Sequence, residues 1–326
     1  LGDVYKRQAV NQAVNQFIWG VPAMVCIIGV GLLLSVRTGF LQIRKFPYAI
    51  KTTIGRMFRK KDASDGAMTP FQAVCTALAG TVGTGNIAGV AGAIAIGGPG
   101  AVFWMWVSAF FGMATKFAEG LLAVKYRVVA KDGHSLGGPF YYIEQGMGKK
   151  WKWLAKIFAF FGVCVGLFGI GTFSQVNGIS SAVHGFFDSA NAHCVNLPFL
   201  GEYSWSVVIS SLVLAFCVAS VLIGGIKRIA SVSQVIVPFM AIIYFLFAGI
   251  LIVTNITAVP SAIAVIVEAA FSPRAITGGA IGSMFVAMQK GVARGIFSNE
   301  AGLGSAPIAA AAAQTKEPVR QGLVSM

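Results

Sequence analysis

Charged residues are scarce in this sequence. Only 11% of its 326 residues are Asp, Glu, Lys or Arg, whereas roughly a quarter of the residues in an average soluble domain are charged. Hydrophobic residues make up 56%, and the mean hydropathy is +0.76. An ordinary soluble domain is therefore excluded, and the composition indicates a polytopic, all-α membrane protein embedded in a lipid bilayer.

Acidic residues are fewer than basic ones, 11 against 25, which gives a formal net charge of +14. Nucleic-acid binding would need these basic residues on one solvated face. They lie instead in the gaps between apolar runs, as they do beside membrane spans. We therefore expect no nucleic-acid partner.

Residue types that carry catalysis or hold metals are also few. None of the three histidines has a second His at ligand spacing, so neither a metal site nor an enzyme is indicated. The five cysteines show no CxxC spacing, and four lie in apolar runs, which indicates packing. These residues are His134, His184, His193, Cys26, Cys75, Cys164, Cys194 and Cys217.

Seven apolar runs have the roughly 20 residues needed to cross about 30 Å of hydrocarbon. The segment 261–271 is too short and is expected to lie on the membrane. Within 37–69, basic and apolar residues fall on opposite faces, which predicts an interfacial amphipathic helix. The seven runs are 17–36, 71–97, 101–124, 154–183, 205–225, 232–254 and 276–313.

Most Lys and Arg residues lie in alternate gaps between these runs, which are therefore predicted to be cytoplasmic. This places residues 37–69 inside and the amino terminus outside. The first eight residues, LGDVYKRQ, look like a translated cloning scar and not like a signal peptide. Because the sequence stops soon after its last apolar run, we expect it to be a fragment.

The second run contains a stretch that is a poor helix. Gly83 and Gly85 each cost about 1 kcal/mol relative to Ala in a helix interior. Thr81, Thr84 and Asn86 carry side-chain oxygens that compete with backbone hydrogen bonds. Irregular backbone at membrane depth survives only where it is buried in protein or lines a cavity. The stretch therefore predicts a broken helix at a site for a small solute and an ion.

The seventh run is interrupted between Lys290 and Pro307 by charges, an Asn and glycines. A carboxylate at that depth is costly and is a functional candidate by default, usually paired. For Glu300 and Arg294, a gating role and a structural ion pair both remain open. Other candidate partners of Glu300 are Lys290, Lys116 and Glu119.

Several glycine pairs have the spacing of closely packed membrane helices. The glycines of the second run do not match a dinucleotide fingerprint, because they read GxGxxxG within an apolar span. The pairs are Gly85 and Gly89, Gly162 and Gly166, Gly278 and Gly282, and Gly291 and Gly295.

Two broken spans separated by four continuous ones are typical of transporters with inverted repeats, in which discontinuous helices meet at the membrane midplane. An ion channel is the alternative, but it would show a repeated filter motif. A transporter coupled to protons would need a titratable group at the site, and Glu300 is the candidate.

At this point a family resemblance becomes clear. The segment TALAGTVGTGNIAGV at 76–90 closely resembles the alanine or glycine:cation symporter family, as do GGPGAVFWMW at 97–106 and GMATKFAE at 112–119. The regions 137–146 and 297–307 are similar to its other signatures. The resemblance implies a bacterial or archaeal cell-membrane importer of alanine or glycine, coupled to sodium and needing no other cofactor.

The resemblance also implies a leucine-transporter-type inverted-repeat fold, here truncated, with about seven transmembrane helices of which two are broken. Residues 9–69 would form an extra helix and the amphipathic segment, and 70–254 the first five-helix repeat. Residues 255–326 would hold an extracellular interfacial segment and the broken first helix of the second repeat. A monomer is favoured.

Position by position, the resemblance implies two groups of site residues. The substrate carboxylate would meet backbone N–H groups at the first break, with one polar contact from the fourth span and an opposing wall from the second break. Sodium would meet backbone carbonyls and one amide side chain. The substrate residues are Gly83, Thr84, Gly85, Gln175, Phe297, Ser298 and Asn299, and the sodium residues are Thr81, Val82 and Asn86. For Gln175, a structural amide bonded to a neighbouring helix remains the alternative.

Overall fold

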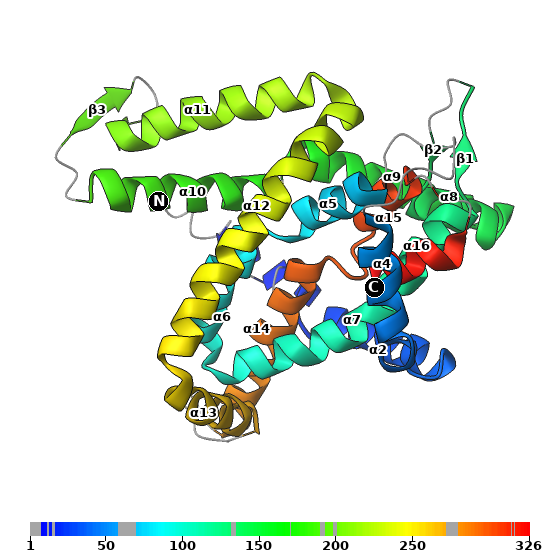
Figure 1. Cartoon of the computed structure of the whole chain (residues 1–326), viewed down its shortest axis with the longest axis horizontal. Helices are drawn as coiled ribbons and strands as arrows, with labels where there is room; N and C mark the ends of the chain where they lie inside the picture. Colours follow the sequence, from blue (N-terminus) through cyan, green and yellow to red (C-terminus); the bar gives the residue numbers. More distant parts are fainter. Residues whose placement is uncertain are drawn as a thin grey trace.

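The computed structural model is almost entirely helical (Figure 1). It describes residues 8–11, 13–14, 17–57, 70–131, 135–169, 171–189, 193–197, 201–271, 280–313, 315 and 317–326. The expected scar at 1–8 lies outside this part except for residue 8, and so do much of the predicted cytoplasmic segment and Gly278.

Most of the longer α-helices lie in the predicted apolar runs, and the shorter ones lie mainly between them. They are α2 (Val21–Arg37), α3 (Leu41–Arg44), α4 (Phe46–Met57), α5 (Pro70–Thr81), α6 (Ala88–Gly97), α7 (Gly100–Lys125), α8 (Pro139–Gly146), α9 (Lys152–Leu167), α10 (Thr172–Phe187), α11 (Trp205–Leu222), α12 (Gly225–Thr254), α13 (Val259–Phe271), α14 (Ala280–Asn299), α15 (Ala306–Ala311) and α16 (Pro318–Ser325). Short 3₁₀ turns are η1 (Thr84–Asn86), η2 (Lys149–Trp151) and η3 (Ile256–Ala258).

Two short antiparallel hairpins depart from the all-α prediction. One pairs β1 (Val128–Val129) with β2 (Ser135–Leu136), and the other pairs β3 (Cys194–Leu197) with β4 (Gly201–Ser204). Both lie in loops between predicted spans, where a hairpin satisfies backbone groups that no helix serves.

Within the described residues, four helical stretches are long and apolar enough to cross a membrane, or five if the bent pair 75–97 counts as one. They match the predicted runs 71–97, 101–124, 154–183, 205–225 and 232–254. The first run forms α2, which is apolar but has only 17 residues. The last is divided between α14 and α15, and α14 carries Lys290 and Arg294. The predicted count of seven spans is therefore not confirmed.

Helix α7 is the centre of the fold, because α2, α13, α14, α15 and α16 all pack against it. Two glycines of α14 permit its close approach. A Cβ on Gly295 would lie 2.9 Å from the Ser108 side chain, and one on Gly291 would lie 2.8 Å from Trp104 Cβ and closer still to the Ala101 carbonyl. The packing prediction for Gly291 and Gly295 is therefore confirmed.

Gly162 and Gly166 of α9 behave differently. Although their spacing is the same, no described atom lies within 4 Å of a Cβ built on either glycine. The packing prediction for this pair is wrong for the described part of the chain. Residue spacing sets which glycines share a helix face but not whether a second helix lies there.

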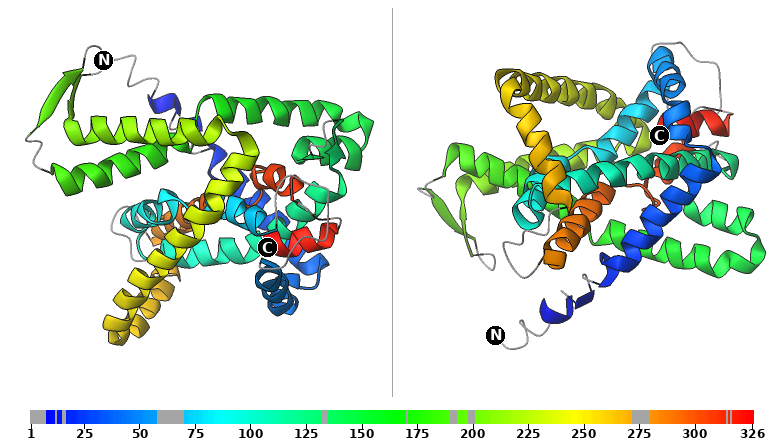
Figure 2. Two further views of the ribbon diagram at one scale, coloured as in Figure 1. Left: turned by 45° about the horizontal axis from the view of Figure 1, so that its top comes forward. Right: turned by 90° about the horizontal axis from the view of Figure 1, so that it is seen from below.

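Helices α10 and α11 run side by side and extend away from the rest of the molecule, and α12 crosses back from them to α5 and α13 (Figures 1 and 2). Large apolar side chains cover their outer surfaces; Phe216 of α11 and Phe245 of α12 are each 75% exposed. Such surfaces suit contact with lipid chains or other apolar helices.

The predicted helix within 37–69 is confirmed as α4, and the short apolar segment 261–271 falls within α13. Ala49 of α4 is buried against Phe117 of α7 and Leu323 of α16, so α4 is held by protein on that side.

Arg127 donates hydrogen bonds to the carbonyl oxygens of Ala311, Ala313 and Thr315 at 3.2, 2.8 and 2.8 Å. This contact fixes the carboxyl end of α15 beside α7.

We predict that Gly291→Ala lowers the stability of the full-length protein by about 1–3 kcal/mol, because the added methyl group overpacks the contact between α14 and α7. The measurement is the thermal unfolding midpoint in detergent. Gly162→Ala is the matched control, and it should be neutral or slightly stabilising because its site is open and Ala favours the helix. A Gly291→Ala protein as stable as wild type would contradict this packing.

Candidate functional site

The predicted break in the second apolar run is present. Helix α5 ends at Thr81, and the helix that follows from Thr84 is bent from it by 59°. Gly83 between them is extended, with φ −155° and ψ −165°. The helical hydrogen-bond ladder is therefore interrupted at the glycines, as expected from their low helix propensity.

The backbone groups at this break are only partly paired. The Asn86 side chain donates from Nδ2 to the Thr81 carbonyl oxygen at 3.2 Å. The Asn86 amide donates to the Gly83 carbonyl oxygen at 3.0 Å. Among the described residues, no hydrogen bond is made to the Val82 carbonyl oxygen. The break thus holds a carbonyl oxygen without a hydrogen bond among the described residues, one residue after the carbonyl that the Asn86 side chain contacts.

The second break is also present. Helix α14 ends at Asn299, and Glu300 adopts a left-handed conformation with φ +54°. Gly302 and Gly304 follow with φ +83° and +80°, and α15 begins at Ala306. The Asn299 Oδ1 atom accepts a hydrogen bond from the Ala301 amide at 2.9 Å. These residues turn the chain sharply between two helical segments.

The two breaks meet. Ser298 Oγ donates a hydrogen bond of 2.6 Å to Asn86 Oδ1, which joins positions 212 residues apart. On the other face of η1, a Cβ built on Gly85 would lie 3.5 Å from the Phe297 ring. Gly85 therefore faces the Phe297 ring at ordinary van der Waals distance.

Helix α10 closes the remaining side of the first break. A Cβ on Gly83 would lie 3.1 Å from both Nε2 and Oε1 of Gln175, and one on Gly178 would lie 3.1 Å from Thr84. Among the described residues, the Gln175 side chain forms no hydrogen bond to a neighbouring helix. Its amide therefore lies against the break with its donors and acceptor available.

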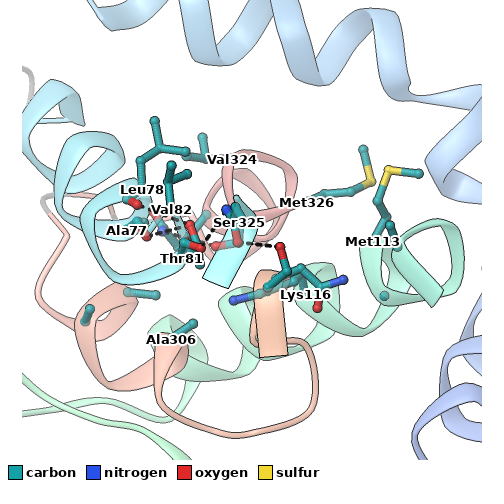
Figure 3. Close-up of a pocket in the computed structure, with 18 residues that line it drawn as sticks. Ala77, Leu78, Thr81, Val82, Met113, Lys116, Ala306, Val324, Ser325 and Met326 are labelled. Carbon is teal, nitrogen blue, oxygen red and sulfur yellow. Dashed lines mark hydrogen bonds between the residues drawn. The ribbon is translucent and has the colours of Figure 1, made fainter. Parts of the chain in front are cut away.

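A cavity of about 320 Å³ opens beside the breaks (Figure 3). Thr81, Val82, Asn86, Ser298 and Asn299 line it, together with residues of α7, α15 and α16. A second cavity of about 280 Å³, lined by residues that include Ile96 of α6 and Lys290, Arg294 and Phe297 of α14, lies beside the same end of α14. The breaks therefore border hollow space on two sides.

Glu300 and Arg294 do not pair with each other. The Arg294 guanidinium lies over the Phe297 ring, 5.9 Å from its centroid. Glu300 Oε2 accepts a hydrogen bond from Ser305 Oγ at 2.8 Å. Within the described chain, no Lys or Arg nitrogen lies within 4.0 Å of the Glu300 carboxylate. The left-handed turn at Glu300 directs it away from the α14 face that carries Arg294, so the structural ion pair, one of the two alternatives, is not formed.

Glu119 of α7 also reaches the second break, where its Oε1 accepts a hydrogen bond from the Gly302 amide at 3.2 Å. Sequence reasoning named Glu119 only as a partner for Glu300. The sequence marks Glu119 only as a carboxylate within an apolar run. Nothing in that pattern indicates the backbone amide, 183 residues away, that donates to its side chain.

Two discontinuous apolar helices that meet at a cavity are the arrangement by which secondary transporters expose backbone groups to solutes. The sequence comparison agrees with this class. The model of the sodium:alanine symporter family matches residues 4–326, and the chain belongs to that family. With its apolar helices, this makes it an integral membrane protein of a prokaryotic cell membrane.

Three relatives illustrate the similarity. An uncharacterized transporter of Haemophilus influenzae is 52% identical over 98% of this chain and 65% of its own length. The sodium/alanine symporter AgcS of Methanococcus maripaludis is 46% identical over 96% and 65%. The putative sodium/proton-dependent alanine carrier protein YrbD of Bacillus subtilis is 42% identical over 96% and 59%. The chain thus spans a little under two thirds of the length of these relatives.

We predict that Asn86→Ala and Ser298→Ala are coupled in stability, because each removes the hydrogen bond between the breaks. The loss of unfolding free energy in the double variant should be smaller than the sum of the losses in the two single variants, by about 0.5–1.5 kcal/mol. Thermal unfolding of the full-length protein measures this. Ser174→Ala is the control, since Ser174 Oγ donates only to the nearby Gly171 carbonyl oxygen. Additive effects of Asn86→Ala and Ser298→Ala would show that the bond is absent.

Proposed function

We propose that this chain carries the substrate and ion site of a sodium-coupled importer of a small neutral amino acid, alanine or glycine. The observation that carries the proposal is the Ser298–Asn86 hydrogen bond, which brings the two broken helices together beside a cavity. Membership of the sodium:alanine symporter family supports the chemistry.

In this proposal the amino-acid carboxylate meets the backbone N–H groups of Gly83, Thr84 and Gly85. These amides begin the helix that follows the first break, and helix amino termini favour anions. Gln175 lies against Gly83 and supplies a polar contact. Phe297, Ser298 and Asn299 form the opposing wall. Glycine and alanine around this space leave little bulk, which favours a small substrate.

Sodium is proposed to bind at the carbonyl oxygens of Thr81 and Val82 with the Asn86 side chain. Hard cations prefer oxygen ligands. The free Val82 carbonyl oxygen and the contact of Asn86 with the Thr81 carbonyl oxygen support this set. A cation here lies close to the carboxylate site, so sodium and substrate should each raise the affinity of the other.

The leucine-transporter-type inverted repeat is part of the proposal. In it, α5 and α6 form the first core helix, within a first repeat at 70–254. Helices α14 and α15 form the broken sixth core helix, within 255–326, and α2 lies outside the core in 9–69. The proposed orientation, with residues 37–69 cytoplasmic and the amino terminus outside, rests on the distribution of Lys and Arg.

We predict that the full-length protein in proteoliposomes accumulates alanine in a saturable way when a sodium gradient is imposed. Asn86→Ala and Gln175→Ala should abolish uptake while leaving membrane insertion intact, because they remove the ion ligand and the polar substrate contact. Asn255→Ala is a matched control, since the Asn255 side chain donates only to the Leu251 carbonyl oxygen and the Thr254 hydroxyl nearby. Wild-type uptake by both site variants would contradict the assignment.

Proton coupling is the alternative, and the name of the Bacillus subtilis relative includes both ions. We predict that Glu300→Gln retains sodium-driven uptake, because Glu300 contacts Ser305 and not the proposed ion ligands. The measurement is labelled alanine uptake under a sodium gradient and, separately, under a proton gradient. Uptake driven by protons in wild type and lost in Glu300→Gln would assign the coupling to this carboxylate instead.

A further inference from the structure

Lys116 is a buried basic residue that the proposed function does not use. It lies near the middle of α7, is only 9% exposed and lines the cavity of about 320 Å³ (Figure 3). Among the described residues, its ammonium group forms no hydrogen bond and has no carboxylate oxygen within 4.0 Å. A buried cation without a partner is costly unless something else satisfies it.

Two carboxylates, those of Glu119 and Glu300, attract the Lys116 ammonium group electrostatically, but among the described residues neither has an oxygen within 4.0 Å of it. Glu119 lies one turn further along α7, but it directs Oε1 to the Gly302 amide and does not line this cavity. Lys116 is the one ionisable side chain among the described residues that line it. The other polar side chains are amides and hydroxyls, including Gln321 and Ser325 of α16. The cavity therefore combines one positive charge with neutral donors.

We propose that Lys116 forms a second binding site, for a small monovalent anionic group, on the path between the breaks and α16. Its three ammonium donors can bind a carboxylate or a halide through charge-assisted contacts. The ligand is either the carboxylate of the transported amino acid or chloride, and only the first of these rests on the proposed function.

Size and position support this site. Ligand pockets range from about 300 to 1,000 Å³, so a cavity of about 320 Å³ suits a small solute. Thr81, Asn86 and Ser298 line both the breaks and this cavity, so a solute that leaves the first site enters it directly. The opposite wall is α16, which follows the last of the seven predicted spans and so lies on the predicted cytoplasmic side. The site then holds the substrate during release.

The test uses the full-length protein in detergent and equilibrium binding of two probes. Labelled alanine is titrated in saturating sodium without chloride, and labelled chloride is titrated without alanine. Lys116→Met removes the charge at nearly constant length, and Lys116→Arg retains it. Lys125→Met is the matched control, because Lys125 lies at the end of the same helix over the Tyr126 ring.

Wild type should bind either a second alanine, with lower affinity than the first, or chloride. Lys116→Met should weaken that binding by at least about tenfold, as expected for a lost charge-assisted contact. Lys116→Arg and Lys125→Met should retain it. Loss in the alanine titration identifies the amino-acid carboxylate, and loss in the chloride titration alone identifies the inorganic anion. Unchanged binding of both probes in Lys116→Met overturns the site.

Two further results keep the test decisive. Ala309→Leu should weaken the same binding without changing any charge, because Ala309 lines the cavity; this variant serves if Lys116→Met fails to fold. If wild type binds no alanine in sodium, the proposed function fails, while the chloride titration still decides whether Lys116 binds an anion.

Discussion

In hydrocarbon, every backbone N–H and C=O group needs a partner, and the short stretch from Thr81 to Asn86 cannot provide them all from within a helix. The structure satisfies some of these groups locally, through the Asn86 side chain, and leaves the Val82 carbonyl oxygen without a hydrogen bond among the described residues. The end of α14 and the side of α10 then surround the break. The packing of these helices therefore follows from the need to enclose irregular backbone.

The same requirement explains the second break and its distant supports. After Asn299 the chain turns through residues with positive φ. Two backbone amides in this turn donate hydrogen bonds to side-chain oxygens, one to the Asn299 amide oxygen and one to the Glu119 carboxylate on α7. Arg127 serves the carbonyl oxygens at the end of α15. Helix α7 thus contacts the second break through Glu119, and Arg127, just beyond the end of α7, holds the far end of α15, while α14 packs against α7 through Gly291 and Gly295. The position of Ser298 opposite Asn86 depends on this framework.

Local composition was sufficient to predict both breaks, because glycine, threonine and asparagine in an apolar run are poor helix formers. It could not predict the Ser298–Asn86 contact, because nothing in the sequence relates positions 212 residues apart. Of the two roles left open for Glu300 and Arg294, the structural ion pair is not formed, because the left-handed turn at Glu300 separates the two side chains and its geometry cannot be derived from composition. Gly162 and Gly166 repeated the packing spacing of Gly291 and Gly295, but spacing alone does not specify the neighbouring helix. Lys116 was recognised only as a possible ion partner, since a cavity formed by four separate segments leaves no local signal.

Sodium and substrate are proposed to interact through the Thr81–Asn86 break. The most direct measurement is the alanine dissociation constant of the full-length protein across a range of sodium concentrations, in wild type and in Asn86→Ala. Sodium should strengthen alanine binding in wild type, and Asn86→Ala should remove most of this dependence. Equal sodium dependence in the two proteins would contradict this proposal and would place the ion elsewhere.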